Sequence, residues 1–227
     1  MRTLFAPQPM QPGVVILDAY EAHHGRTVLR LKAGDRCRVV DGCGSSAEAV
    51  VREVGRHSLQ VEVGSPQQHA PPSAHDLTVA VAAPKGNHLD DVLRSLVELG
   101  VGAISIVECE RSSRMPKLER LQRIAVEAVK QCGSAWLPSV GIHGPLLAAP
   151  LPGRVVILAP DGAAPLVGKP QPTTLVIGPE GGLTTDEHER LCASGAEACR
   201  LTDTILRIET AAIAAAAHWA IHWEHHG

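Results

Sequence analysis

A proline-rich segment, Gly64 to His75 (GSPQQHAPPSAH), separates two parts of this 227-residue chain that have different hydrophobic patterns. The segment holds three prolines, no Asp, Glu, Lys or Arg, and no hydrophobic period, which is typical of a linker. A chain of this length can bury one sizeable core or two modest ones. We therefore predict two domains, the first at residues 1–70 and the second at residues 76–227.

The first part favours β-structure. Within Leu59 to Val63 the apolar residues Leu59, Val61 and Val63 alternate with Gln60 and Glu62, as in a strand with one buried face. Turn residues, including Asp41-Gly42 and Gly55, separate short runs of this kind and indicate a small β-barrel. The other predicted strands are Val14 to Leu17, Cys37 to Val40 and Ala47 to Val54.

The second part alternates strand and helix patterns, as α/β domains do. Apolar runs at Leu77 to Ala83 and Ala103 to Val107 flank Leu89 to Leu99, whose apolar residues recur at helical spacing before Gly100. Further strands are predicted at Arg154 to Ala159 and Thr174 to Ile177. One helix is predicted after Pro116, and another from the capping box Thr184 to Glu187 as far as about Ser194. The last predicted helix runs from Ile208 to Glu224.

Several classes of protein are disfavoured. The longest apolar run, Ala211 to Ala217, is far shorter than the roughly 20 residues that span a bilayer. Prolines interrupt the N-terminal segment, so we expect no signal peptide and a cytoplasmic protein. The six cysteines form no CxxC pair and are expected to be reduced and mostly buried. His218, His222, His225 and His226 lack a completing Asp or Cys, so no metal site is predicted.

Composition does not favour general nucleic-acid binding, because the net charge is −3 and only 2% of residues are aromatic. A local patch is nevertheless present. Between residues 111 and 130 there are six basic residues against Glu119 and Glu127. A spacing of three keeps such residues on about one side of a helix, which predicts a phosphate-binding stripe. The alternative is a solvated helix face without a partner. The stripe comprises Arg111, Arg114, Lys117, Arg120 and Arg123, with Arg26, Arg30, Lys85 and Arg94 as weaker additions.

The sequence Ile177 to Gly182 (IGPEGG) lies between a predicted strand and the capped helix. Three glycines in five residues let the backbone adopt positive φ and approach a bound molecule closely. The loop lacks both the Lys-Ser/Thr ending of a Walker loop and the spacing of a dinucleotide loop. Without further information it is either a ligand loop or a tight connection.

The segment Leu201 to Ala211 leads into the last predicted helix. Arg207 and Glu209 flank the start of that helix beside apolar residues, where an unpaired charge is costly. Either the two side chains pair with each other, or they face a site.

These two loops together resemble the RsmE-type 16S ribosomal RNA (uracil-N3)-methyltransferases of the SPOUT superfamily. Five other segments match the family in the same order. They are HHGRTVLRLKAGD at His23 to Asp35, Lys85, SLVELGV at Ser95 to Val101, Glu110-Arg111-Ser112, and EAVKQCG at Glu127 to Gly133. The chain departs from the family at Thr202, Thr204 and Ile208, where many members have Gly, Arg and Thr.

The resemblance implies an α/β SPOUT methyltransferase domain with a C-terminal trefoil knot, preceded by a PUA-like β-barrel that binds RNA. It also implies a homodimer that acts on 16S rRNA in the small ribosomal subunit, and not on DNA or a membrane. Three loops would bind S-adenosylmethionine, through Leu158, Ala159, Ile177, Gly178, Pro179, Glu180, Gly181, Gly182, Leu201, Ile205, Leu206 and Thr210.

Methylation at N3 of uracil requires that the base be unpaired and that N3 lose its proton. We expect Glu209 to accept that proton and Arg207 to stabilise negative charge on a uracil carbonyl oxygen. Two other functions remain open at this point: a ribose 2′-O-methyltransferase of the same superfamily, and a non-catalytic RNA-binding ribosome-assembly factor.

Overall fold

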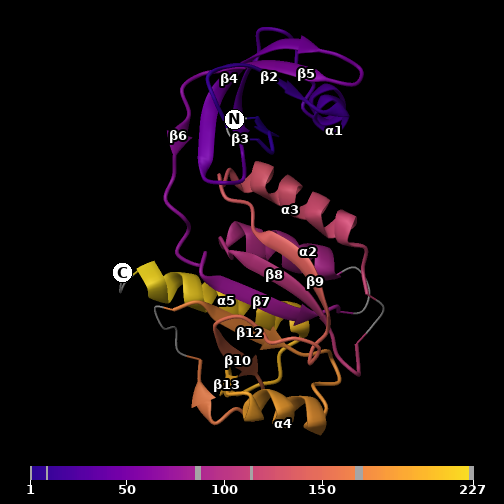
Figure 1. The fold of residues 1–227 in the computed structure, drawn as a ribbon, viewed down its shortest axis with the longest axis vertical. Coiled ribbons are helices and arrows are strands. Elements are labelled where there is room, and N and C mark those ends of the chain that lie inside the picture. Colours follow the sequence, from indigo (N-terminus) through magenta and orange to yellow (C-terminus); the bar gives the residue numbers. More distant parts are fainter. Residues whose placement is uncertain (1, 9, 85–87, 113–114, 167–170, 225–227) are drawn as a thin grey trace. The chain divides into compact units, whose positions relative to one another are not determined.

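A computed structural model describes residues 2–8, 10–84, 88–112, 115–166 and 171–224 (Figure 1). By contacts between its residues the chain divides into two compact units. Unit 1 comprises residues 1–71 and 126–137, and unit 2 comprises residues 72–125 and 138–227. The segment 126–137 therefore packs with the N-terminal unit, although it lies beyond the linker in sequence.

Unit 1 is built on one sheet with the strand order β1-β3-β4-β5-β2, in which β6 pairs with β4. The strands are β1 (Thr3–Phe5), β2 (Gly13–Leu17), β3 (Arg36–Val40), β4 (Ser45–Val54), β5 (Leu59–Val63) and β6 (Gln67–Gln68). Leu59, Val61 and Val63 are buried while Gln60 and Glu62 are partly exposed, as the alternation predicted. Leu4, Val39 and Val51 complete the centre of this core.

A short helix, α1 (Ala19–His23), and a π-helical turn, η1 (His24–Val28), follow β2. The Asp18 carboxylate caps α1 by accepting the N–H of Glu21 at 2.9 Å. Neither element was predicted, and β1 and β6 were also missed. Arg26 lies on η1, and Arg30 follows it with a φ of +51°.

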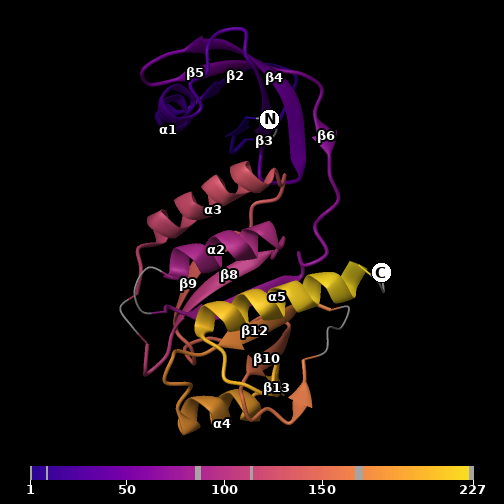
Figure 2. The same cartoon turned by 180° about the vertical axis from the view of Figure 1, so that it is seen from behind.

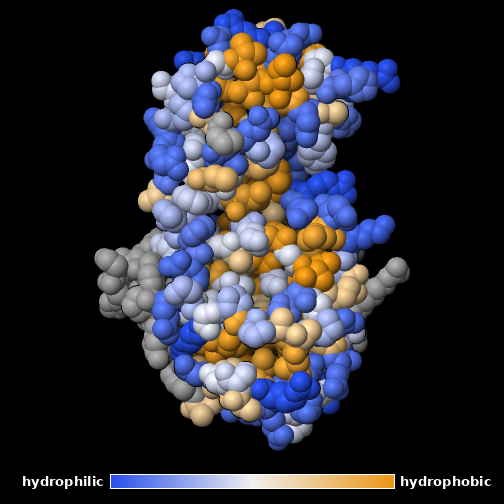
Figure 3. Space-filling model, viewed as in Figure 1, coloured by the Kyte–Doolittle hydropathy of each residue, from blue (hydrophilic) through white to orange (hydrophobic). Residues whose placement is uncertain are grey.

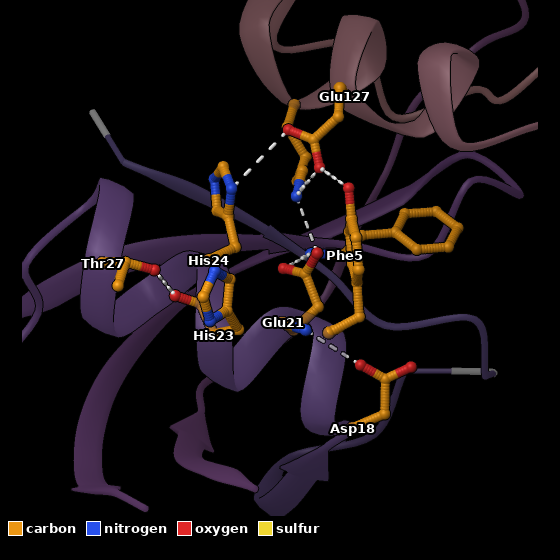
Figure 4. A network of polar contacts seen from close by, with 9 residues as sticks. Phe5, Asp18, Glu21, His23, His24, Thr27 and Glu127 are labelled. Carbon is orange, nitrogen blue, oxygen red and sulfur yellow. Dashed lines mark hydrogen bonds and ion pairs between the residues drawn. The ribbon is translucent and has the colours of Figure 1, made fainter. Parts of the chain in front are cut away.

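A buried group of charges joins α1 to the last turns of α3 (Leu118–Cys132) inside unit 1 (Figure 4). The Lys130 ammonium lies 2.7 Å from carboxylate oxygens of both Glu21 and Glu127. The hydroxyl of Tyr20 donates to Glu127 at 2.9 Å, and the other Glu21 oxygen accepts the N–H of Phe5 at 3.1 Å. These contacts explain part of the EAVKQCG motif, because Glu127 and Lys130 both belong to it.

This group predicts a pH dependence of stability. Burial alone raises the pKa of Glu127, but the hydrogen bond and charge of Lys130, together with Tyr20 and His24, outweigh burial and hold that pKa below its usual value. A carboxyl group whose pKa is lower in the folded state stabilises the fold above its unfolded pKa, and this contribution disappears as pH falls through the folded pKa. We expect the melting-temperature difference between the wild type and Glu127→Gln to shrink below about pH 4. A difference that stayed constant on acidification would contradict this assignment.

Unit 2 contains a parallel sheet with the strand order β11-β13-β10-β12-β7-β8-β9. Its strands are β7 (Leu77–Ala82), β8 (Ala103–Glu108), β9 (Ser139–Pro145), β10 (Arg154–Leu158), β11 (Ala164–Pro165), β12 (Thr173–Ile177) and β13 (Glu197–Arg200). The helices α2 (His88–Glu98) and α5 (Ile208–Glu224) pack against each other, and α5 also contacts β7 and β12 (Figure 2). The helix α4 (Thr185–Ala193) follows β12.

This strand order brings the loops that follow β10, β12 and β13 to one edge of the sheet. All pairings in the sheet are parallel, and β10 lies between β12 and β13. Because parallel strands end at the same edge, the segments that follow β10, β12 and β13 meet there. The mixed α/β fold class is confirmed, whereas the trefoil knot stays a prediction.

The structure also bears on the predictions for the cysteines, a membrane span and a metal site. All six cysteines are free thiols, but only Cys37, Cys109 and Cys199 are buried, so the prediction of mostly buried thiols was wrong for half of them. No helix in the described ranges is long and apolar enough to cross a membrane. Nor do those ranges hold a group of three metal-ligating side chains, and His225 and His226 lie outside them.

Candidate active site

A cavity of about 690 Å³ opens in unit 2 at the carboxyl ends of β10, β12 and β13. Its walls come from three separate segments, residues 157–161, 177–185 and 201–208 without Asp203, together with His188 and Ala211. The glycine loop and the Leu201 to Ala211 segment therefore share one cavity, although eighteen residues separate them in sequence. Apolar side chains gather on the lower part of the face in Figure 3, where Figure 1 draws β10 and β12.

The glycine loop forms a tight turn that its sequence requires. Gly182 has a φ of +69°, and its N–H donates to the carbonyl of Pro179 at 2.8 Å. A Cβ on Gly178 would lie 3.1 Å from the Leu183 side chain and 3.2 Å from the Leu183 nitrogen. Glycine is thus needed at 182 for its backbone angle and at 178 for close approach. The predicted capping box is confirmed, with Thr184 and Glu187 bonded reciprocally at the start of α4.

The third segment places a cation on the cavity wall. Arg207 is exposed and lines the cavity, next to Leu206 and to Ile205, whose exposed fraction is 84%. Among the described residues, the Arg207 side chain has no hydrogen-bond or ion-pair partner, and it forms no salt bridge with Glu209. Of the two possibilities raised by the sequence, the internal ion pair is not formed, which favours a side chain that faces a site.

Most residues predicted to bind the cofactor line this cavity. They are Leu158, Ala159, Ile177, Gly178, Pro179, Glu180, Gly181, Gly182, Leu201, Ile205 and Leu206. Thr210 and Glu209 do not line it. Sequence reasoning overlooked the polar residues Asp161, Thr185 and His188 on the wall. Asp161 had a usable signal, because a polar residue in a Pro-Asp-Gly turn directly after a buried strand is well placed at a ligand site.

The basic stripe is weaker than the sequence suggested. Lys130, which contributed to the local excess of charge, is buried and paired with carboxylates. Arg120 pairs with Asp90 at 2.8 Å, and Arg94 pairs with Asp91 at 2.9 Å. Lys117 and Arg123 are exposed and have no ion-pair partner among the described residues. Lys85 and Arg114 lie outside the described residues.

A buried thiol near this region does not offer a nucleophile. Burial, and to a smaller extent the charge of Glu187, raise the pKa of Cys109 to about 11, although the hydrogen bond with Ser112 acts in the opposite direction. Because the thiolate is the reactive form, Cys109 is almost entirely protonated near neutral pH. Chemistry at the cavity therefore depends on other side chains.

Comparison with known proteins defines the class. Residues 71–220 match the model of the RNA methyltransferase domain, and residues 17–64 match the model of the RNA methyltransferase PUA domain. The chain therefore consists of an RNA methyltransferase domain preceded by an RNA methyltransferase PUA domain.

The family can be stated more narrowly. The chain is 33% identical to ribosomal RNA small subunit methyltransferase E of Synechocystis, over 92% of this chain and 74% of that protein. It is 32% identical to the enzyme of that name from Mycobacterium bovis, over 91% and 86% of the two chains. The chain belongs to this ribosomal RNA methyltransferase family. A crystal structure of the Neisseria gonorrhoeae member bound to S-adenosyl methionine has a TM-score of 0.86, with 29% identity over 96% of this chain and 95% of that one.

Proposed function

We propose that this protein transfers a methyl group from S-adenosylmethionine to N3 of a uridine in the 16S rRNA of the small ribosomal subunit. The observation that carries the proposal is the cavity lined jointly by residues 177–185 and 201–208. The bound S-adenosyl methionine of the Neisseria gonorrhoeae relative supports the choice of cofactor.

The residues present suit this cofactor. A cavity of about 690 Å³ lies within the range of roughly 300 to 1,000 Å³ that is usual for small-ligand sites. Ile177, Leu158 and Leu206 provide apolar walls for an adenine ring, and the backbone of the glycine loop can approach the ligand closely. Asp161 and Glu180 add negative charge at the wall, which suits a ligand that carries a positive sulfonium. When bound, S-adenosylmethionine supplies an electrophilic methyl group, so the protein need only align the base and exclude water.

Arg207 would act on the uracil. Loss of the N3 proton leaves negative charge on the ring, which is shared with the carbonyl oxygens, and a guanidinium at the cavity wall can stabilise that charge. The position of Glu209 outside the wall does not support its predicted role as proton acceptor. Asp161 and Glu180 are carboxylates on the wall, and comparing pH–rate profiles of Asp161→Asn, Glu180→Gln and Glu209→Gln would assign the acceptor.

Calorimetric titration with S-adenosylmethionine separates an enzyme from a binding module. We expect saturable binding to the unliganded protein, whereas an RNA-binding assembly factor with an idle cavity would give no binding heat. Alkaline hydrolysis of methylated RNA then separates the two enzymatic alternatives, because a 2′-O-methyl group blocks cleavage at its own nucleotide. Full cleavage at the methylated position is expected here, and a resistant dinucleotide would indicate ribose methylation.

The close packing of Gly162 against β13 allows a test of how the cavity wall is held in place. Its N–H donates to Ala159 at 3.1 Å, and an added Cβ would lie 2.4 Å from the carbonyl carbon of Cys199 on β13. Backbone cannot yield at that distance without moving β13, which leads into residues 201–208. We expect Gly162→Ala to weaken S-adenosylmethionine binding at least about tenfold, equivalent to about 1.4 kcal/mol. Gly141→Ala is the matched control, because its Cβ would meet nothing within 4 Å. Equal affinities for the two variants would refute the role of this packing.

The physiological setting is also proposed. We infer that the protein acts in the cytoplasm as a homodimer on small subunits, with the PUA domain contacting RNA. Ile205 is an exposed apolar side chain beside Arg207, as expected for a surface that RNA or a second copy covers. Light scattering would give the oligomeric state, and a monomer at assay concentrations would contradict the dimer.

A further inference from the structure

We propose that Arg111 positions the glycine loop of the cofactor pocket and does not bind RNA phosphate, with Glu187 as a second tie between the same two segments. This inference rests on the proposed function, since it assigns a role to residues beside the cofactor pocket. It removes the first member of the predicted basic stripe from the RNA surface.

The contact of Arg111 is specific. Its Nη1 donates to the carbonyl oxygen of Gly181 at 2.6 Å, across 70 residues of sequence. A Cβ on Gly181 would lie 3.2 Å from Cδ of Arg111, so the arginine side chain packs directly on the loop. The N–H of the same peptide unit, that of Gly182, donates to Pro179. Both polar atoms of this peptide are therefore bonded, which fixes the plane of the peptide in the cavity wall.

Glu187 provides an independent tie. It is 3% exposed, and its two carboxylate oxygens accept from different segments. Oε1 accepts the N–H of Glu110 at 2.8 Å, and Oε2 accepts the N–H of Thr184 at 2.8 Å. It forms no salt bridge with another described residue. A buried carboxylate held by N–H groups of two segments fixes the distance between those segments.

The turn that carries Arg111 is itself closed. The N–H of Cys109 donates to Oγ of Ser112, and the N–H of Ser112 donates to the carbonyl of Cys109, both at 2.9 Å. Residues 109–112 follow β8 directly, so the sheet holds one end of this turn. Arg111 and Glu110 are thus presented to the glycine loop from a fixed support, which is what a positioning residue requires.

The two roles for Arg111 predict opposite measurements. In the first arm, S-adenosylmethionine affinity is measured by calorimetry for the wild type, Arg111→Ala and Arg123→Ala. In the second arm, binding of the same proteins to small-subunit RNA is measured over a range of salt concentrations. Arg123→Ala is the matched control because it removes the same charge from an exposed side chain.

We expect Arg111→Ala to weaken binding of the cofactor at least about tenfold. KM for the cofactor should rise with little change in kcat at saturation. The salt dependence of RNA binding should stay that of the wild type. Arg123→Ala should keep the cofactor affinity and reduce the salt slope of RNA binding by about 0.7–0.9, as loss of one phosphate contact does. If Arg111→Ala keeps wild-type cofactor affinity and reduces the salt slope of RNA binding by that amount, Arg111 is a phosphate ligand and the inference is wrong.

Glu187→Gln tests the second tie without removing the side chain. The amide retains one acceptor oxygen but turns its NH₂ group towards an N–H donor, so one of the two ties is lost. We expect cofactor affinity to fall. The melting temperature should stay above the assay temperature, so that the variant is still folded. Unchanged affinity in this variant would remove Glu187 from the proposal. If the wild type itself binds no cofactor, the proposed function fails, whereas tight binding by both the wild type and Arg111→Ala overturns this inference alone.

Discussion

Arg207→Ala is expected to lower the rate of methyl transfer by about 10²–10³-fold, the loss typical when a group that stabilises transition-state charge is removed. Arg207 lines the cavity, is exposed, and has no partner among the described residues, so its loss should not affect folding. The rate is measured with methyl-labelled S-adenosylmethionine and small subunits that lack the modification. Affinity for the cofactor, measured separately, should change much less than the rate.

Arg200→Ala is the control for this variant. Arg200 lies shortly before the same segment, and it pairs at 3.5 Å with Asp203, which is itself 91% exposed, so the pair contributes little. We expect near wild-type turnover from Arg200→Ala and an intermediate rate from Arg207→Lys, whose charge lacks the planar fork. Wild-type turnover in Arg207→Ala would show that this cation does not act on the reacting base.

Lys130→Met is expected to destabilise unit 1 by about 3–5 kcal/mol, as removal of one partner of a buried ion pair does. The Lys130 and Glu21 side chains are only 4% and 5% exposed. Without the ammonium, Glu21 keeps only the N–H of Phe5 among the partners described here, and Glu127 loses its strongest contact. Urea unfolding followed by circular dichroism gives the change in free energy.

Two further variants isolate the cause. Lys32→Met removes an exposed lysine of the same unit and should change stability by about 0.5 kcal/mol or less. Glu21→Gln combined with Lys130→Met removes the buried charge together with its partner, so it should recover part of the loss. If Lys130→Met proves as stable as Lys32→Met, the charge group does not hold the last turns of α3 to α1.

Sequence patterns predicted the elements whose signals are local and strong. The strand Leu59–Val63 and the helix Ile208–Glu224 have the predicted bounds, because strict alternation and a long alanine-rich run leave little ambiguity. The strands β9, β11 and β13 were missed. They contain Gly, Pro or charged residues, and their pairing with neighbours in the sheet forms them despite weak local preference. For α1 a signal was present, because Asp18 and Glu21 have the spacing of a helix cap.

The sequence predicted the residues of the cavity only in part, for a different reason. Arg207, Ile208 and Ala211 line the cavity while Glu209 and Thr210 do not, because successive side chains at the start of a helix point in directions about 100° apart. The sequence alone did not fix that rotation. For Arg111, the charge pattern identified a cation but not its partner, which lies 70 residues away on the glycine loop.

The most direct test of the account is nucleoside analysis of small-subunit RNA after incubation with the wild-type protein and methyl-labelled S-adenosylmethionine. The subunits come from a strain that lacks the modification, and a reaction with Arg207→Ala runs in parallel. We predict one labelled nucleoside, 3-methyluridine, that is absent from the parallel reaction. Label in a ribose-methylated nucleoside, or no label in RNA despite cofactor binding, would contradict the account.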